Sequence, residues 1–324
     1  MRTSISRLFC FGLGYMARHV VARLEEDARK AGIEQREKNP EANDDASGMG
    51  LIVHGTTRTP SQANEFLFDA DHELSDAACE ALQQADAVLI TIPPDENGDR
   101  VFPLYKDFLE YMPHLKWVGY CSSVSVYGDH RGGWVDEKTG VNPITARARY
   151  RVKAEKQWLE SGLPVHIFRL GGIYGEKRSA LEQARHNMPI VSKPDHAMNR
   201  IHAVDAARAM VASMQQPRTG AIYNLCDDMP TSREDILRYA YEIQNLDAPE
   251  TLLWNEADLS PKARSFFEEC KRVRAELTKS ELGLQWLYPN YLSGLDALLA
   301  QSTRPASALG INDNDITARR RIAE

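Results

Sequence analysis

The chain has 324 residues, of which 43% are hydrophobic, and a formal net charge of −7. This length leaves room for two domains, or for one large domain with an added lobe, and the apolar fraction suffices for a sizeable core. The acidic balance argues against nucleic acid or an anionic membrane as the main partner, because both favour a basic face. No apolar run of about 18 residues and no signal peptide is found, so we expect a cytoplasmic protein.

The cysteines also favour a cytoplasmic protein. There are five, none of them in a CxxC pair. An odd number without paired spacing argues against a disulfide framework and against a metal site. Cys10 and Cys121 lie in apolar runs, where we expect them to be small core residues in a reducing compartment.

Short apolar runs alternate with helical patterns through the first half of the chain. The runs are too short for helices and lack polar alternation, which is typical of strands covered on both faces. Strands that alternate with helices predict an α/β fold with a doubly wound parallel Rossmann sheet. The predicted strands are 7–11, 51–54, 66–68, 87–91, 117–121 and 165–170, and the predicted helices are 15–30, 77–84, 101–112 and 146–160.

The alternation of predicted strands and helices, which is less regular after about residue 175, predicts a domain organisation. Residues 1–175 form the Rossmann dinucleotide-binding domain, with a polar surface insertion at 33–50. Residues 176–303 form a smaller, mixed C-terminal substrate lobe. Within it, 223–226 reads as a strand returning to the Rossmann sheet, and 232–245 as a helix capped near Thr231. Residues 304–324 are polar and aperiodic, and we expect a flexible tail.

A glycine-rich turn follows the first predicted strand and opens the first helix. It reads G-x-G-x-x-A, in the strand–turn–helix context that a dinucleotide site requires. The first glycine allows the tight turn, the second lets a pyrophosphate approach the backbone, and the alanine allows close packing of helix on strand. The alternative is a turn that binds nothing. The residues of this candidate site are Gly12, Leu13, Gly14, Tyr15, Met16 and Ala17.

The second strand indicates which dinucleotide is bound. An NAD site usually has an acidic residue at this strand's end, but here Thr57 and Arg58 follow without one. Arg58 is suited to a 2′-phosphate, so we predict NADP as the cofactor, with NAD as the alternative. Arg58 could also be an ordinary solvent-exposed arginine of a turn. Asp69 is a candidate acceptor for the adenine amino group, although aspartate is also common in turns. Ile92 and Pro93, after the fourth strand, are further candidate cofactor contacts.

Four later segments occur in a familiar order. They are Ser122–Gly128 (SSVSVYG), Arg169–Gly175 (RLGGIYG), Arg200–Ala207 (RIHAVDAA) and Tyr223–Leu225 (YNL). Together with the glycine turn they resemble the extended short-chain dehydrogenase/reductase superfamily, in its epimerase/dehydratase branch. The resemblance covers roughly residues 7–300 and implies a Rossmann fold, a nicotinamide cofactor and a substrate cleft.

The resemblance also implies a Ser–Tyr–Lys catalytic group, which is incomplete here. Ser123 matches the serine. In the best register Arg147 stands at the tyrosine position and Arg151 at the lysine position. A guanidinium stays protonated, so it cannot act as a general acid or base. Tyr150 and Tyr127 are the candidate replacements, each with the alternative of an ordinary structural tyrosine.

Other roles come from the same resemblance. Arg151 is a candidate for holding the cofactor, as are Leu170 and Gly171 after the sixth strand. Candidate substrate contacts are Arg147, Arg200 and His202, the histidine having a structural role as its alternative.

The resemblance further implies a homodimer through 101–112 and 146–160. An apolar face at 108–112 (Phe108, Leu109, Tyr111 and Met112) favours it, and a monomer stays open.

The motifs and the resemblance together favour an NADP-dependent oxidoreductase, epimerase or dehydratase acting on a small or nucleotide-linked substrate. The alternative is a non-catalytic dinucleotide-binding redox sensor or interaction protein.

Overall fold

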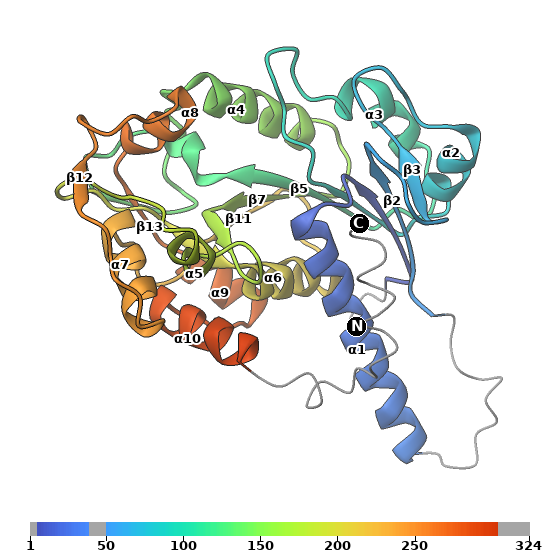
Figure 1. Cartoon of the computed structure of the whole chain (residues 1–324). Helices are drawn as coiled ribbons and strands as arrows, with labels where there is room; N and C mark the ends of the chain where they lie inside the picture. The colour runs from blue at the N-terminus through green and yellow to red at the C-terminus, as the bar shows by residue number, and fades with distance from the viewer. Residues whose placement is uncertain (1–4, 39–49, 304–324) are drawn as a thin grey trace.

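Seven parallel strands form the centre of the computed structural model, which describes residues 5–38 and 50–303 (Figure 1). Their order across the sheet is β11-β7-β5-β4-β1-β2-β3. This arrangement confirms the predicted doubly wound α/β fold, because successive strands run outward in both directions from β1 and β4. The strands are β1 (Arg7–Phe11), β2 (Ile52–Thr57), β3 (Glu65–Leu67), β4 (Ala87–Ile90), β5 (Trp117–Ser123), β7 (Val165–Leu170) and β11 (Ala221–Leu225).

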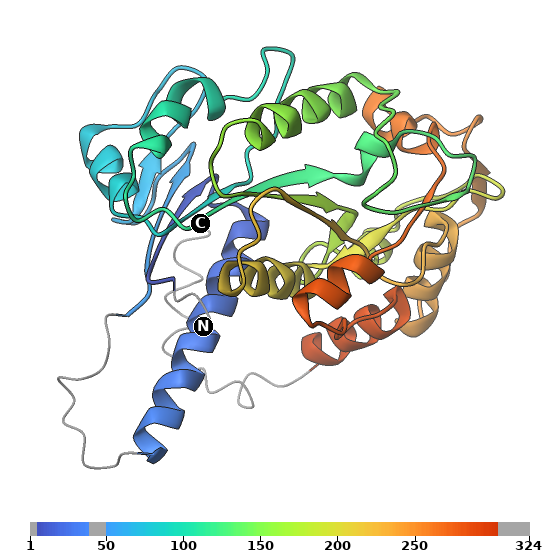
Figure 2. The same cartoon turned by 180° about the vertical axis from the view of Figure 1, so that it is seen from behind.

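Helices cover both faces of this sheet, as Figures 1 and 2 show from opposite sides. On β1, Leu8 and Cys10 join the apolar core beneath α1 (Tyr15–Lys38) and α6 (Ala203–Gln215). Phe9 and Phe11 join the core on the other face. The helices there are α2 (Asp76–Gln83), α3 (Phe102–Glu110) and α4 (Ala146–Leu159). Both side-chain sets are buried, which explains the absence of polar alternation in the strand sequences.

The C-terminal part builds a smaller cluster beside the sheet. Helices α5, α7 and α10 pack around a core of their own that includes Leu181, Leu237 and Leu295. Short parallel pairs, β8 with β10 and β9 with β12, connect this cluster to the rest. The elements not yet given are η2 (Val124–Tyr127), β6 (Trp134–Val135), β8 (Gly172–Tyr174), α5 (Ala180–Arg185), β9 (Ile190–Ser192), β10 (Arg200–His202), α7 (Arg233–Ile243), β12 (Thr251–Leu253), α8 (Pro261–Arg264), η3 (Ser265–Phe267), β13 (Arg272–Val273), α9 (Glu276–Leu282) and α10 (Tyr291–Ser302).

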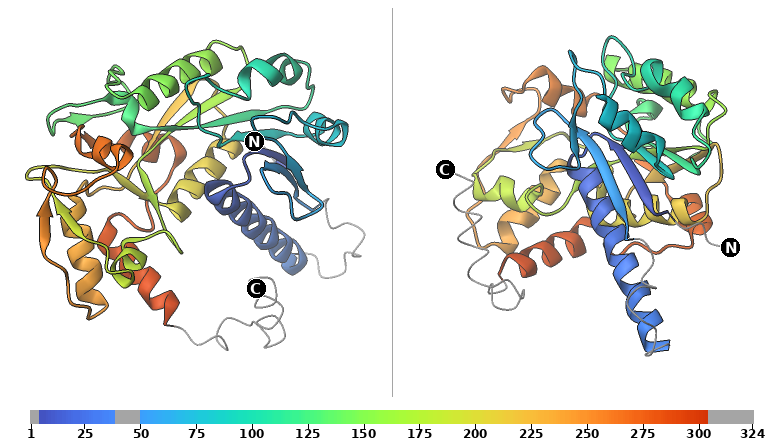
Figure 3. Two further views of the ribbon diagram at one scale, coloured as in Figure 1. Left: turned by 45° about the horizontal axis from the view of Figure 1, so that its top comes forward. Right: turned by 90° about the vertical axis from the view of Figure 1, so that its right-hand side faces the viewer.

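One local expectation needs correction. Helix α1 continues through residues 33–38, where we predicted the start of a polar insertion, and its far end projects from the body of the protein (Figure 3). This stretch is rich in Glu, Gln, Arg and Lys, which favour helix even without an apolar face. The rest of the insertion, 39–49, and the predicted tail at 304–324 lie outside the described residues. Helix α7 is capped by Ser232, beside Thr231 as expected, since the Ser232 side chain accepts from the Asp235 N–H at 2.9 Å.

The predicted apolar face at 108–112 is also largely internal. Leu109 and Met112 are buried in the core beneath α3, with exposures of 1% and 6%. Tyr111 is 86% exposed. Leu109 and Met112 are therefore not part of the exposed apolar face that we predicted. The homodimer itself stays a prediction. None of the helices within the described ranges combines the length and apolarity needed to cross a membrane.

Candidate functional site

The glycine turn lies at the carboxyl end of β1, beside β4. Gly12 has a φ of +91°, and a Cβ placed on it would lie 2.6 Å from the Thr91 Oγ1 atom. Only glycine fits there without strain. At Gly14 an added Cβ would meet nothing within 4 Å, so the backbone is open on that side. The first glycine is thus fixed by the fold, whereas the second leaves a free approach to the main chain.

Two threonines hold the turn in place. The Gly12 N–H donates to the Thr56 Oγ1 at 2.8 Å, and the Leu13 N–H donates to the Thr56 carbonyl at 2.7 Å. The Thr91 hydroxyl donates to the Gly12 carbonyl at 2.6 Å. Sequence reasoning selected Thr57, whose Oγ1 instead accepts from Thr59 N–H at 3.4 Å. The alternation of side chains along β2 could have indicated Thr56, because neighbouring residues of a strand point to opposite faces.

Helix α1 begins directly after the turn. Its first N–H groups have no partner within the helix and carry the positive end of its dipole. Met16 and Ala17 are buried against the sheet, which fixes the helix end beside the open Gly14. The turn lies between β1 and β4, where strand order reverses, and ligands of doubly wound sheets bind at such a point. The residues present therefore fit a diphosphate.

The carboxyl end of β2 carries the residues predicted to choose between NAD and NADP. Arg58 is exposed and has neither a hydrogen bond nor an ion pair with any described residue. Asp69 instead organises its own turn, accepting from Asp71 N–H at 2.9 Å and from His72 N–H at 3.1 Å. The backbone hydrogen bond from Asp71 and the His72 ring lower the pKa of Asp69. Asp69 thus follows its alternative interpretation as a turn residue, whereas Arg58 is available to a ligand.

Two of the positions that match the catalytic group, Ser123 and Arg151, lie at the carboxyl end of β5. The Ser123 Oγ accepts from Ser125 N–H at 3.2 Å and caps η2. Arg151 donates to the Cys121 carbonyl at 2.7 Å, which places its guanidinium at this strand end. Tyr150 is partly exposed, and its hydroxyl has no hydrogen-bond partner among the described residues.

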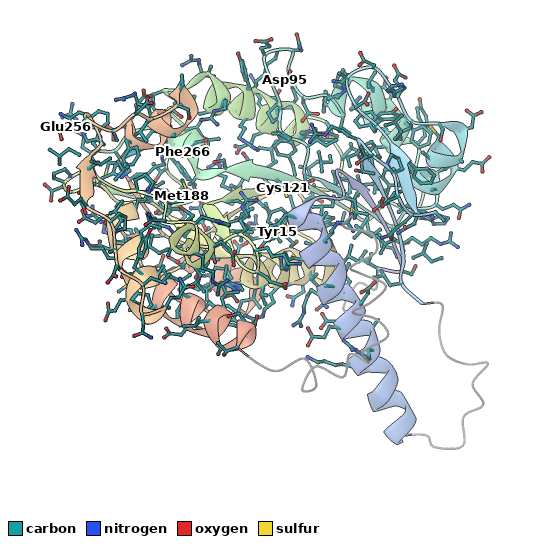
Figure 4. The ribbon with its side chains drawn as sticks, viewed as in Figure 1. Tyr15, Asp95, Cys121, Met188, Glu256 and Phe266 are labelled. Atoms are coloured by element: carbon teal, nitrogen blue, oxygen red, sulfur yellow. The ribbon has the colours of Figure 1, made fainter. Side chains whose placement is uncertain are left out.

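Arg147 points elsewhere. It donates to the Ser265 Oγ at 2.7 Å, and its guanidinium lies 5.5 Å from the ring centre of Phe266. Figure 4 shows Phe266 toward α8, Cys121 on β5, and Tyr15 at the end of α1 nearest the sheet. The residue at the usual tyrosine position thus joins α4 to the α8–η3 segment.

The structure argues against the predicted catalytic role of Tyr127. Its side chain is fully buried, and its hydroxyl donates to the Asn224 Oδ1 at 2.8 Å and accepts from Arg169 at 3.0 Å. Burial raises the pKa of Tyr127 to about 12. Arg169 is in turn paired with buried Glu155 at 2.8 Å. Tyr127 is therefore a structural member of a closed polar network.

His202, a predicted substrate contact, is also buried. It is 3% exposed, its Nδ1 accepts from Val204 N–H at 3.2 Å, and its ring centre lies 4.0 Å from that of Tyr288. Burial lowers the pKa of His202 to about 4, so the ring is neutral. His202 therefore caps α6, which fits the structural alternative, and its Nε2 has no hydrogen-bond partner among the described residues.

The predicted cofactor contacts at the ends of β4 and β7 differ in access. Ile92 lies against Gly12, and Pro93 is exposed. Leu170 is buried in the core, and Gly171 packs against the backbone of Asn199, with 3.0 Å from an added Cβ to its carbonyl. The Leu170 side chain is therefore not exposed to a ligand, and Gly171 has no side chain to offer one.

A cavity of about 320 Å³ lies in the C-terminal cluster, between β8, β10, α5 and α7. Arg200, a predicted substrate contact, lines it together with Arg178 and Arg233, which sequence reasoning missed. Arg178 also lies over the ring of Tyr15, with 5.4 Å from its guanidinium carbon to the ring centre. The cavity wall and the glycine turn therefore meet where Arg178 contacts Tyr15, although the two residues are 163 positions apart in the sequence.

The family model described as "NAD dependent epimerase/dehydratase family" matches residues 12–226, from the glycine turn to the end of β11. The chain belongs to this family. YeeZ of Escherichia coli K12 is 30% identical over 224 residues, covering 66% of this chain and 75% of YeeZ.

Solved structures share the fold of this chain. A conserved protein of unknown function from Silicibacter pomeroyi DSS is 37% identical, with a TM-score of 0.77, and the match covers 92% of this chain and 100% of that one. The human epimerase family protein SDR39U1, solved with NADPH, is 14% identical with a TM-score of 0.65, covering 90% and 98%. The second likeness shows the shared fold.

One buried acid in this epimerase/dehydratase family member gives a prediction about stability. Asp227 is 3% exposed, and its Oδ2 has no hydrogen-bond partner among the described residues. Burial raises the pKa of Asp227 to about 8, against an ordinary value of 3.8. A raised pKa favours the protonated form in the folded state, so its stabilising effect is complete below about pH 4 and is lost as the pH rises to about 8.

We therefore expect Asp227→Asn to stabilise the protein increasingly across this interval, by on the order of 2 kcal/mol at pH 8 relative to pH 4. Urea unfolding at both pH values measures the difference. Asp228→Asn, at the exposed neighbouring position, is the control. A stability difference that does not change with pH would contradict the prediction.

Proposed function

We propose that this protein binds NADP(H) at the glycine turn and uses it as an oxidoreductase, epimerase or dehydratase on a small or nucleotide-linked substrate. The observation that carries the proposal is the open Gly14 beside the N-terminus of α1, together with the unpartnered Arg58 at the end of β2. Structures with this fold were solved with NADPH in one case and with NAD in others, which supports a nicotinamide dinucleotide and leaves the choice between the two to Arg58. A cytoplasmic location and a homodimer belong to the same proposal.

The residues near β5 supply the rest of the chemistry. A bound nicotinamide accepts or delivers hydride. Ser123, partly exposed at the strand end, orients the substrate oxygen through its hydroxyl. Tyr150 is the proposed proton donor or acceptor, because its phenol is accessible and Arg147 and Arg151 stay charged. Arg151 holds the strand end at the Cys121 carbonyl and keeps a positive charge beside the reaction centre.

The test compares binding with turnover. NADPH is expected to raise the melting temperature of the wild type by mass action. Ser123→Ala and Tyr150→Phe are expected to keep that shift and to lower NADPH-dependent turnover of a carbonyl panel about 100-fold. Lys153→Gln, exposed on the same helix, is the matched control. Turnover that is unchanged in both variants would contradict these roles.

One observation favours a second function, a dinucleotide-binding sensor or interaction protein without turnover. Arg147, at the usual tyrosine position, is engaged with Ser265 and Phe266 rather than left free for chemistry. In this case NADPH still raises the melting temperature, yet no member of the panel is reduced above background. Hydride exchange with any substrate would exclude the sensor function.

A further inference from the structure

The cavity between α5 and α7 has an unusual charge balance. Three arginines line it, Arg178, Arg200 and Arg233, and none of them forms an ion pair with a described carboxylate. Glu182, the acid in the lining, is already paired with Arg185 at 2.6 Å. The buried Asp227 carboxyl group acts on Arg200, but no carboxylate acts on Arg233 in the same way. The walls of the cavity therefore carry net positive charge.

Arg233 has fewer hydrogen bonds than Arg200, the other partly buried arginine of the three. Its guanidinium has five N–H donors, and the hydrogen bond found for it goes to the Gln183 Oε1 at 2.9 Å. Burial lowers the pKa of Arg233, because a partly desolvated cation is costly without a counter-charge. Its remaining donors are free for a ligand in the cavity.

Arg200 holds the opposite wall. It donates to the carbonyl oxygens of Met198 at 3.2 Å, Thr231 at 2.9 Å and Ser232 at 3.3 Å. Carbonyl groups fix the guanidinium without cancelling its charge, so Arg200 adds a fixed positive charge. Tyr174 and Ile236 supply apolar lining nearby.

We propose that this cavity binds a small ligand through an oxyanion group, a phosphate or a carboxylate, held by Arg233 and attracted by Arg200. A cavity of about 320 Å³ is at the lower end of the range for ligand pockets, about 300–1,000 Å³, and favours a compact metabolite over a full nucleotide-linked one. The apolar part of the ligand packs on Tyr174 and Ile236. In taking this ligand for the substrate, the inference rests on the proposed function.

The position of Arg178 connects this ligand to the cofactor. Its guanidinium lies over Tyr15, the first residue of α1, and the Tyr15 hydroxyl donates to the Glu176 carbonyl at 3.2 Å. An anion in the cavity and a diphosphate on the glycine turn would thus share one wall. This contact places the substrate beside the cofactor rather than in a separate site.

Isothermal titration calorimetry on the full chain with saturating NADPH tests the proposal, because NADPH keeps added anions off the glycine turn. The probes are phenyl phosphate, benzoate and neutral benzyl alcohol. Phenyl phosphate, benzoate or both should bind more tightly than benzyl alcohol, and the tighter of the two identifies the oxyanion. Arg233→Gln should weaken that probe at least 10-fold, and Arg233→Lys less, since it keeps the charge.

Arg238→Gln, on the same helix and 51% exposed, is the matched control and should change the affinity less than twofold. Equal binding of the tighter anion by wild type and Arg233→Gln would overturn the proposal, as would tighter binding of benzyl alcohol. A preserved NADPH-induced shift shows that Arg233→Gln is folded. If NADPH fails to bind the wild type, the proposed function fails, whereas Arg233-dependent binding without NADPH still supports the cavity.

Discussion

Gly14→Val is expected to abolish NADPH binding while changing the free energy of unfolding by less than about 1 kcal/mol. A Cβ at Gly14 meets nothing within 4 Å in the protein itself, so we expect folding to tolerate the substitution. The same side chain occupies the space through which a diphosphate reaches the backbone N–H groups of α1. Calorimetric titration with NADPH and urea unfolding measure the two effects separately.

Gly12→Ala provides the opposite result in the same turn. Its φ of +91° strains any other residue, and the new Cβ would lie 2.6 Å from the Thr91 Oγ1. We expect a loss of stability of about 2–4 kcal/mol, seen as a lower urea midpoint. If Gly14→Val destabilises the protein as much as Gly12→Ala, or binds NADPH like the wild type, the assignment of Gly14 to the diphosphate is wrong.

Arg58→Ala is expected to weaken NADPH binding about 30-fold and to leave NADH binding nearly unchanged. A charge-assisted contact between a guanidinium and a phosphate contributes about 2 kcal/mol, and only NADPH carries the 2′-phosphate. Because the side chain is exposed, added salt should reduce the wild-type preference as well. Calorimetric titration with both dinucleotides at low and high salt measures the preference.

The matched control for Arg58 is Arg29→Ala. Arg29 is an exposed arginine in the second half of α1, away from the glycine turn, and its substitution should leave both affinities unchanged. A wild type that prefers NADH, with no change in Arg58→Ala, would reverse the choice of cofactor. The glycine turn would still be the binding site in that case, because its geometry does not depend on Arg58.

Local sequence patterns determined a good part of this protein. The short apolar strands, the spacing of the helices and the glycine turn are properties of neighbouring residues, and strand limits such as Arg7–Phe11 and Val165–Leu170 agree with the structure. The family likewise follows from motifs that occur in order along the chain. Each of these signals is set by side-chain burial and turn geometry within a few residues.

Only the tertiary structure decided what the individual polar side chains do. Tyr127 and His202 lie in promising motifs, yet Asn224 and Arg169 form hydrogen bonds to the Tyr127 hydroxyl, and Tyr288 packs against the His202 ring. The arginines of the cavity come from three separate segments, so no local pattern unites them. Partners distant in sequence determine desolvation and hydrogen bonding, and these decide whether a polar group is structural or free to bind a ligand.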